Sequence, residues 1–107
     1  MPRLTEDTAA DALAALGNRT RLRLFRVLVK AGRGGMNVGD LQKRLSIPAS
    51  TLAHHLASLH RAELITQERQ GREVISVADY DAIQTLSAFL VEECCCGFAD
   101  DAVDDVA

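Results

Sequence analysis

The stretch Asn37–Ala62, NVGDLQKRLSIPASTLAHHLASLHRA, decides the fold. It contains two apolar patterns at helical spacing, a short one from residue 38 to residue 45 and a longer one from residue 49 to about residue 62. Between them, Pro48 disfavours helical dihedrals at Ile47 and suits the start of the second helix. We therefore predict two amphipathic helices joined by a tight turn, with Asn37 as the N-cap of the first helix.

Two more helices are expected before this stretch. The run Thr8–Leu16 is rich in alanine, and Thr5 or Thr8 is placed to cap it. Asn18 is placed to cap a second helix over residues 19–31, which Gly32 ends. The apolar residues of this second helix follow steps of three and four, which predicts one buried stripe made of Leu22, Leu24, Phe25, Leu28 and Val29.

The hydrophobic period changes after Ala62. Residues 65–70 and 72–77 are β-prone runs on either side of Gly71, which predicts a β-hairpin. A final helix is expected from Asp79 or Tyr80 onward, with Gly97 as the first residue beyond its end. The predicted order is helix, helix, short helix, turn, helix, hairpin, helix. This order predicts a mainly α winged helix-turn-helix domain with a small β-hairpin as the wing, spanning residues 1–97. The remaining residues, 98–107, form an acidic tail that we expect to be disordered.

Charge is unevenly distributed along the 107 residues, although the formal net charge is only −3. Residues 18–72 hold eleven of the twelve Lys and Arg residues but only three of the fifteen acids, so this part carries +8. A basic middle between acidic ends is typical of a domain that meets a polyanion, although solvated helix faces give the same composition.

Several classes of protein are excluded by composition. No apolar run approaches the roughly 18 residues of a membrane span, and residues 1–10 lack the hydrophobic stretch of a signal peptide. We therefore expect a cytoplasmic location without a membrane partner. A phosphate-binding Gly-rich loop and a catalytic Ser/His/Asp grouping are missing, and a thiol reductase would need Cys-x-x-Cys at a helix N-terminus. We expect neither an enzyme nor a required cofactor.

The helix over residues 49–62 has the pattern of a recognition helix, which keeps one face apolar and exposes small polar or basic groups to DNA. Two arginines near the hairpin tip are placed to reach phosphates or a minor groove. The predicted DNA-binding residues are Ser50, Thr51, His54, His55, Ser58, Arg61, Arg69 and Arg72. For the adjacent histidines, DNA contact or simple exposure is favoured over metal binding. A protein-interaction module of the same fold is the alternative, and it predicts no salt-sensitive binding to DNA.

Three segments resemble one known family. Ala15–Leu24 (ALGNRTRLRL) is similar to the second-helix signature of the ArsR/SmtB metal-responsive repressors, and Val38–Leu41 (VGDL) to the start of their third helix. Ser50–Leu56 (STLAHHL) resembles their recognition helix. The resemblance implies a homodimer built from the first and last helices, which binds a palindromic double-stranded operator and releases it when an inducer binds.

The run Cys94-Cys95-Cys96 suggests what the inducer is. Three thiolates complete the ligand set of a soft three-coordinate ion such as As(III) or Sb(III). Consecutive residues of an ideal helix point about 100° apart, so convergence requires the helix to unwind, which the neighbouring Gly97 makes easier. We predict a metalloid site at a distorted last turn or at the start of the tail. Coordination by two cysteines, with the third auxiliary, is left open.

Other sensor sites are compatible with the fold, and the cysteines have a second interpretation. The family's arsenic site on the DNA-binding helix would need cysteines beside Val38–Leu41, and its zinc site on the last helix would need a histidine after Asp79; both are missing. The resemblance points instead to arsenic-responsive members with a Cys-Cys pair late in the last helix, some of which carry a third cysteine further on. A thiol-based redox or persulfide sensor of the same fold is the main alternative, although Glu92 and Glu93 disfavour a thiolate.

Overall fold

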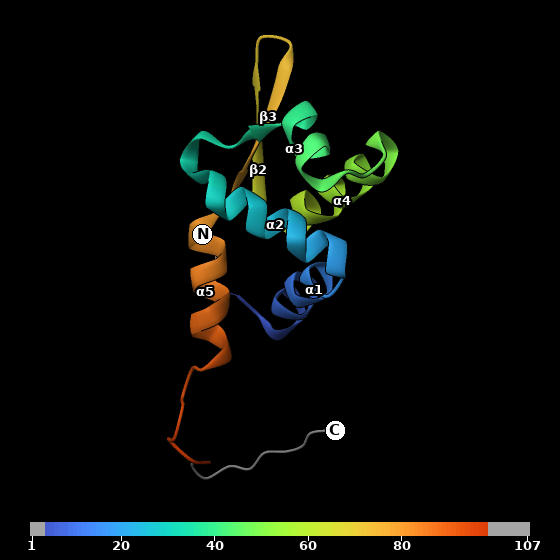
Figure 1. The fold of residues 1–107 in the computed structure, drawn as a ribbon. Coiled ribbons are helices and arrows are strands. Elements are labelled where there is room, and N and C mark those ends of the chain that lie inside the picture. The colour runs from blue at the N-terminus through green and yellow to red at the C-terminus, as the bar shows by residue number, and fades with distance from the viewer. Residues whose placement is uncertain (1–3, 99–107) are drawn as a thin grey trace.

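The computed structural model describes residues 4–98 and shows a winged helix-turn-helix domain (Figure 1). Residues 99–107 lie outside this range, and with them most of the predicted disordered tail. The element order agrees with the order predicted from the sequence. The elements are α1 (Glu6–Leu16), α2 (Arg19–Ala31), the 3₁₀ turn η1 (Gly32–Gly34), β1 (Met36–Asn37), α3 (Val38–Leu45), α4 (Ala49–Arg61), β2 (Ile65–Gln70), β3 (Glu73–Ala78) and α5 (Tyr80–Leu90).

Side-chain caps set where the helices begin. The Thr5 hydroxyl accepts a hydrogen bond from the Thr8 backbone N–H at 3.1 Å, and the Thr8 hydroxyl accepts one from the Thr5 N–H at 2.9 Å. The side-chain oxygens of Asn18, Asn37 and Asp79 each accept a bond from the backbone N–H three residues on. Each cap satisfies a backbone donor that the first helical turn leaves unpaired, so the predicted helix starts are confirmed to within two residues.

The wing belongs to a three-stranded antiparallel sheet with strand order β1-β3-β2. The hairpin of β2 and β3 was predicted, whereas β1 was not, because two residues carry no detectable alternation. β1 pairs Met36 with Ser76, and this close approach requires Gly35. A Cβ at Gly35 would collide with the Ser76 carbonyl oxygen and lie 2.7 Å from the Ile75 Cγ2 atom. The φ of Gly35 is 67°, which is a conformation that favours glycine.

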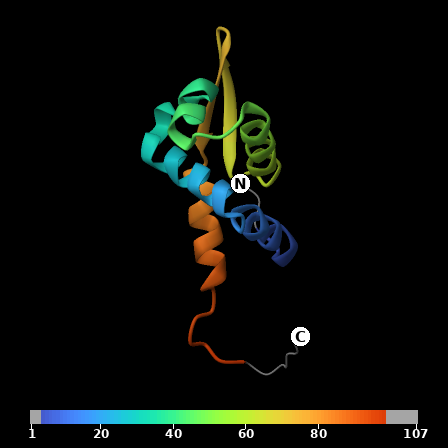
Figure 2. The same ribbon diagram turned by 45° about the vertical axis from the view of Figure 1, so that its right-hand side comes forward.

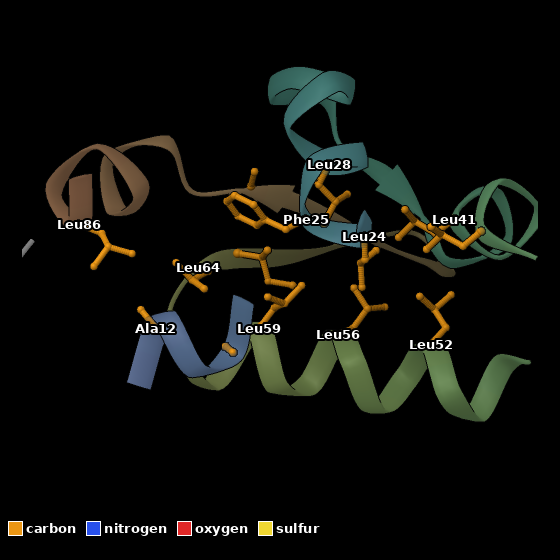
Figure 3. Packing of buried hydrophobic residues seen from close by; sticks show 14 of the residues in the cluster. Ala12, Leu24, Phe25, Leu28, Leu41, Leu52, Leu56, Leu59, Leu64 and Leu86 are labelled. Atoms are coloured by element: carbon orange, nitrogen blue, oxygen red, sulfur yellow. The ribbon is translucent and has the colours of Figure 1, made fainter. Parts of the chain in front are cut away.

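The core lies between α2 and α4 (Figure 3). Leu24, Phe25 and Leu28 of α2 point toward the leucine row of α4, and all of these side chains are buried. The predicted stripe on α2 was too wide, because Leu22 is 42% exposed and Val29 is 39% exposed. Both residues lie at least about 100° around the helix from Leu28, whereas the buried Leu24 and Phe25 lie within about 60° of it.

The last helix is shorter than predicted. α5 ends at Leu90, and residues 91–95 form successive turns in which the Cys94 N–H donates to the Val91 carbonyl at 2.9 Å. Gly97 therefore does not follow the end of the helix, and the cysteines do not form its last turn. Glutamates at the negative end of a helix dipole are unfavourable, and cysteine has low helix propensity, so Leu90 is a reasonable end point.

The wing and α5 extend from the body in opposite directions (Figures 1 and 2). The Tyr80 hydroxyl donates to the Val29 carbonyl at 3.1 Å, which joins the start of α5 to the end of α2. Within residues 4–98, none of the helices has the length and apolar content of a membrane span.

Candidate DNA-binding surface and cysteine cluster

The outer face of α4 carries three of the predicted DNA-binding residues. Ser50, His54 and Arg61 are exposed. On a helix with about 100° per residue, they lie on the side opposite the buried leucines. Thr51 and Ser58 are half-buried along one edge of this face. The helix starts at Ala49 because Pro48 is extended with a ψ of 151°, so the exposed residues begin in its first turn.

His55 departs from the prediction. Its side chain is only 8% exposed, so it is not part of the outer face of α4. It stands three residues after Leu52 and four before Leu59, and this spacing on the sequence already indicated the inner face. The imidazole Nδ1 has no hydrogen-bond partner within the described residues. Burial, reinforced by the charges of Arg21 and His54, lowers the pKa of His55 below its ordinary value of 6.5, which favours the neutral ring.

The wing presents its two predicted arginines to solvent. Arg69 lies in β2, and Arg72 follows Gly71 in the hairpin turn. The φ of Gly71 is 64°. The wing is attached near its tip to the N-cap of α3, because the Asn37 side-chain amide donates to a Glu73 carboxylate oxygen at 3.2 Å. This bond holds the wing in a defined position relative to the helix-turn-helix.

A shallow hollow between α3 and the wing adds one basic residue that the sequence prediction missed. Lys43 and Arg72 both line this hollow, together with the first turn of α3. Lys43 is exposed and is well separated from Arg72 in sequence. Only the folding of the wing against α3 brings the two cations to the same surface, so no local pattern could have indicated it.

The cysteines lie at the end of the molecule opposite the wing (Figure 1). All three are exposed, and none forms a disulfide within the described residues. The Sγ atoms of Cys94 and Cys95 are 3.3 Å apart, and positive φ values of 65° at Glu93 and 64° at Cys95 replace helical geometry here. Within residues 4–98, no three Cys, His, Asp or Glu side chains converge to hold an ion, so Cys96 stands apart from the pair.

The separation of the two sulfur atoms has a chemical meaning. Suppose that both bind one ion through bonds of about 2.3 Å, as in zinc thiolates. Sulfurs 3.3 Å apart then subtend roughly 92° at the ion, whereas a tetrahedral ion requires them to be about 3.8 Å apart. A near-right angle suits a pyramidal ion with a lone pair, such as As(III) or Sb(III), better than it suits zinc.

An exposed polar recognition-type helix beside an arginine-bearing wing defines this protein as a winged helix-turn-helix DNA-binding domain. Residues 16–68 match the family model described as a helix-turn-helix domain. This match and the similarity to solved ArsR-type regulators indicate a helix-turn-helix transcriptional regulator similar to the ArsR family. Regulators of this kind are not enzymes, in agreement with the sequence prediction.

Several solved structures of regulatory proteins are similar to this chain. An ArsR-like transcriptional regulator from Rhodococcus sp. RHA1 has 26% identity over 78% of this chain and 76% of its own, with a TM-score of 0.70. A possible transcriptional regulator for arsenical resistance has 28% identity over 75% of this chain and 80% of its own, with a TM-score of 0.65. Reduced HlyU from Vibrio cholerae has 26% identity over 83% and 90%, with a TM-score of 0.62. None of the curated proteins compared with it matches this sequence.

Proposed function

We propose that this protein is a homodimeric repressor that binds a double-stranded operator and releases it when As(III) or Sb(III) binds the cysteine cluster. The observation that carries the proposal is the pair of exposed sulfur atoms, Cys94 Sγ and Cys95 Sγ, 3.3 Å apart at the end of α5. Similarity to a possible regulator for arsenical resistance supports the choice of ion.

The DNA-binding half of the proposal rests on the outer face of α4 and on the wing. The first turns of α4 would enter the major groove, with Ser50 and His54 toward base edges. Arg61, which also donates to the Ser58 hydroxyl at 3.4 Å, would lie nearer the backbone phosphates. Arg69 and Arg72 would contact phosphates or an adjacent minor groove from the wing.

The dimer is supported by apolar surface that the single chain leaves uncovered. Leu13 of α1 is 42% exposed, and at the end of α5 Leu90 and Val91 are 58% and 63% exposed. Exposed aliphatic side chains on the first and last helices would be buried against the same helices of a second copy, since apolar burial is the main driving force for association. A domain of this size also buries a modest core by itself.

Communication between the two sites would follow α5. This helix begins directly after the wing strand β3, and the Tyr80–Val29 hydrogen bond connects its start to α2. An ion that draws a third ligand toward Cys94 and Cys95, either Cys96 or a donor of the second subunit, would reshape residues 91–96 and displace the end of α5. A shift at a dimer interface changes the separation of the two recognition helices, which must match half-sites about 34 Å apart.

A titration of DNA binding by fluorescence anisotropy tests the proposal. The probe is a labelled duplex from the promoter region of the protein's own gene. We expect arsenite to weaken binding by about tenfold or more, within the usual range of allosteric coupling. Cys94→Ser and Cys95→Ser should abolish the response and leave the arsenite-free affinity unchanged. An affinity that arsenite does not alter would refute the sensing half, and salt-insensitive or absent DNA binding would refute the repressor.

The second candidate is a redox-sensing repressor, which the same 3.3 Å sulfur pair and the likeness to reduced HlyU favour. In that case an oxidant such as hydrogen peroxide takes two electrons from the two thiols, which join as a disulfide while two protons and the electrons convert the peroxide to water. X-ray absorption of the arsenite-treated protein distinguishes the candidates, because it counts the sulfur neighbours of arsenic. Release of DNA by peroxide, together with no sulfur-bound arsenic, would favour the redox sensor.

A further inference from the structure

The outer face of α2 carries four basic residues that no part of the site uses. We call this set, Arg19, Arg23, Arg26 and Lys30, the basic stripe. All four side chains are exposed, and they line a shallow hollow together with Leu22 and Val27. Within residues 4–98, the side chains of the basic stripe form no hydrogen bond or ion pair. The face is therefore strongly cationic and has no counter-charge among the described residues.

The basic stripe points away from the proposed DNA-binding face. With about 100° per residue, its four members fall within roughly 60° of each other on the side of α2 opposite Leu24 and Leu28. Those two leucines point at α4 across the core (Figure 3). The outer faces of α2 and α4 thus look out from opposite sides of the domain, and a duplex read by α4 would leave the basic stripe uncovered.

The basic stripe creates repulsion that a counter-charge would relieve. Its members are separated by steps of four, three and four residues, which makes each cation a neighbour of the next on the helix surface. Like charges at these spacings destabilise a helix. Acids are missing from the whole of residues 18–39, so the helix supplies no compensating partner.

The sequence contains one segment with the complementary pattern. Residues 99–107, which follow the described part of the chain, include Asp100, Asp101, Asp104 and Asp105 and hold no basic residue. The two Asp pairs repeat after four residues, which is the step that separates Arg19 from Arg23. We propose that the acidic segment Asp100–Asp105 docks on the basic stripe of α2 in the same chain. Val103, between the two Asp pairs, would lie over the apolar floor of the hollow beside Leu22 and Val27.

The connecting chain is long enough for this contact. The Tyr80–Val29 hydrogen bond fixes the start of α5 beside the end of α2, and the 11 residues of α5 extend about 16 Å from there. If the turns of residues 91–95 open, the ten residues from Leu90 to Asp100 span up to about 33 Å, which covers the return. Because Cys94–Cys96 lie in this connection, docking would hold the cysteine segment against the body of the protein. The inference holds whether or not the cysteines bind a metalloid.

Backbone amide chemical shifts of the full chain, measured by NMR at low salt, test the proposal. The test variant replaces all four tail aspartates by asparagine (D100N, D101N, D104N and D105N), and the control replaces two acids of α1 (E6Q and D7N). We expect the tail variant to shift amides of residues 19–30 and the control to leave them unchanged. About 0.5 M NaCl should produce the same shifts in the unmodified chain, because it reduces the screening length to a few ångströms. The shifts should be independent of protein concentration.

Three results would overturn the proposal. The first is that the amides of residues 19–30 do not respond to the tail substitutions. The second is that the response appears in residues 49–61 instead. The third is that the response depends on protein concentration, which would indicate contact between chains. A charge exchange gives an independent check, since R23E with R26E should abolish the contact and D100K with D101K should restore it. If an unrelated DNA duplex shifts residues 19–30 equally in the unmodified chain and the asparagine variant, the basic stripe serves DNA and the tail proposal is wrong.

Discussion

Replacing Gly35 by alanine should destabilise the fold far more than the same change at Gly32. The two glycines share a backbone conformation that only glycine adopts readily, with φ and ψ of 67° and −165° at Gly35 and 79° and −163° at Gly32. Forcing an alanine into this region costs about 1–3 kcal/mol at either position. The positions differ in their surroundings, because a Cβ at Gly32 meets no atom within 4 Å.

At Gly35 the added methyl group has nowhere to go. It would collide with the Ser76 carbonyl oxygen and lie 2.7 Å from γ-methyl carbons of Ile75 and Val77. Overpacking of this kind adds about 1–3 kcal/mol, so G35A should lose roughly 2–6 kcal/mol in total. The total stability of such a domain is about 5–15 kcal/mol, so G35A should be close to unfolding while G32A remains folded.

Urea unfolding followed by circular dichroism measures the difference, with both variants compared under identical buffer and protein concentration. The DNA affinity of G32A should remain near that of the unmodified protein. Equal losses of unfolding free energy in the two variants would show that the pairing of β1 with β3 does not enforce glycine at position 35. That result would refute the packing argument and leave only backbone strain.

Three further predictions follow from the site geometry. H54A should weaken operator binding by about tenfold with little change in stability, as expected for an exposed base contact. H55A should mainly lower the unfolding free energy, by about 2 kcal/mol from lost packing. Fluorescence anisotropy measures the first effect and urea unfolding measures the second. R69A and R72A should each reduce the slope of log binding constant against log salt by about one, and an unchanged slope would show that the wing does not contact phosphates. Because burial lowers the folded-state pKa of His55, the unfolded chain binds this proton first as the pH falls. The stability linked to His55 is therefore fully present above about pH 6.5 and is lost as the pH falls toward the folded-state pKa. H55L should show a flatter dependence of unfolding free energy on pH, and an identical dependence would remove His55 as the cause.

The candidate site was predictable in part. The exposed positions on α4 follow from the spacing of its leucines, so the exposure of Ser50, His54 and Arg61 was predictable, and their contact with DNA stays a prediction. His55 was misplaced, because its polarity was given more weight than its spacing. The proximity of Lys43 to Arg72 depends on the wing packing against α3, and no pattern within either element encodes it.

The cysteine cluster shows the same division. The sequence supplied three adjacent thiols and the expectation that helical geometry would have to break for them to converge. It did not indicate that α5 ends at Leu90, nor that the sulfurs of Cys94 and Cys95 approach within 3.3 Å. Helix ends depend on the balance of a few weak terms, namely caps, the dipole and exposure, and these are decided only when the rest of the helix is packed.

Sequence alone determined the element order, the helix caps and the leucine rows that make this a winged helix-turn-helix, because periodicity and capping are local properties that a few neighbouring residues express. Tertiary structure decided that Lys43 and Arg72 share one surface and where the short strand β1 pairs. These features depend on contacts between residues far apart in the chain, such as Met36 with Ser76 and Tyr80 with Val29, and the energy of such contacts exists only after the chain has folded.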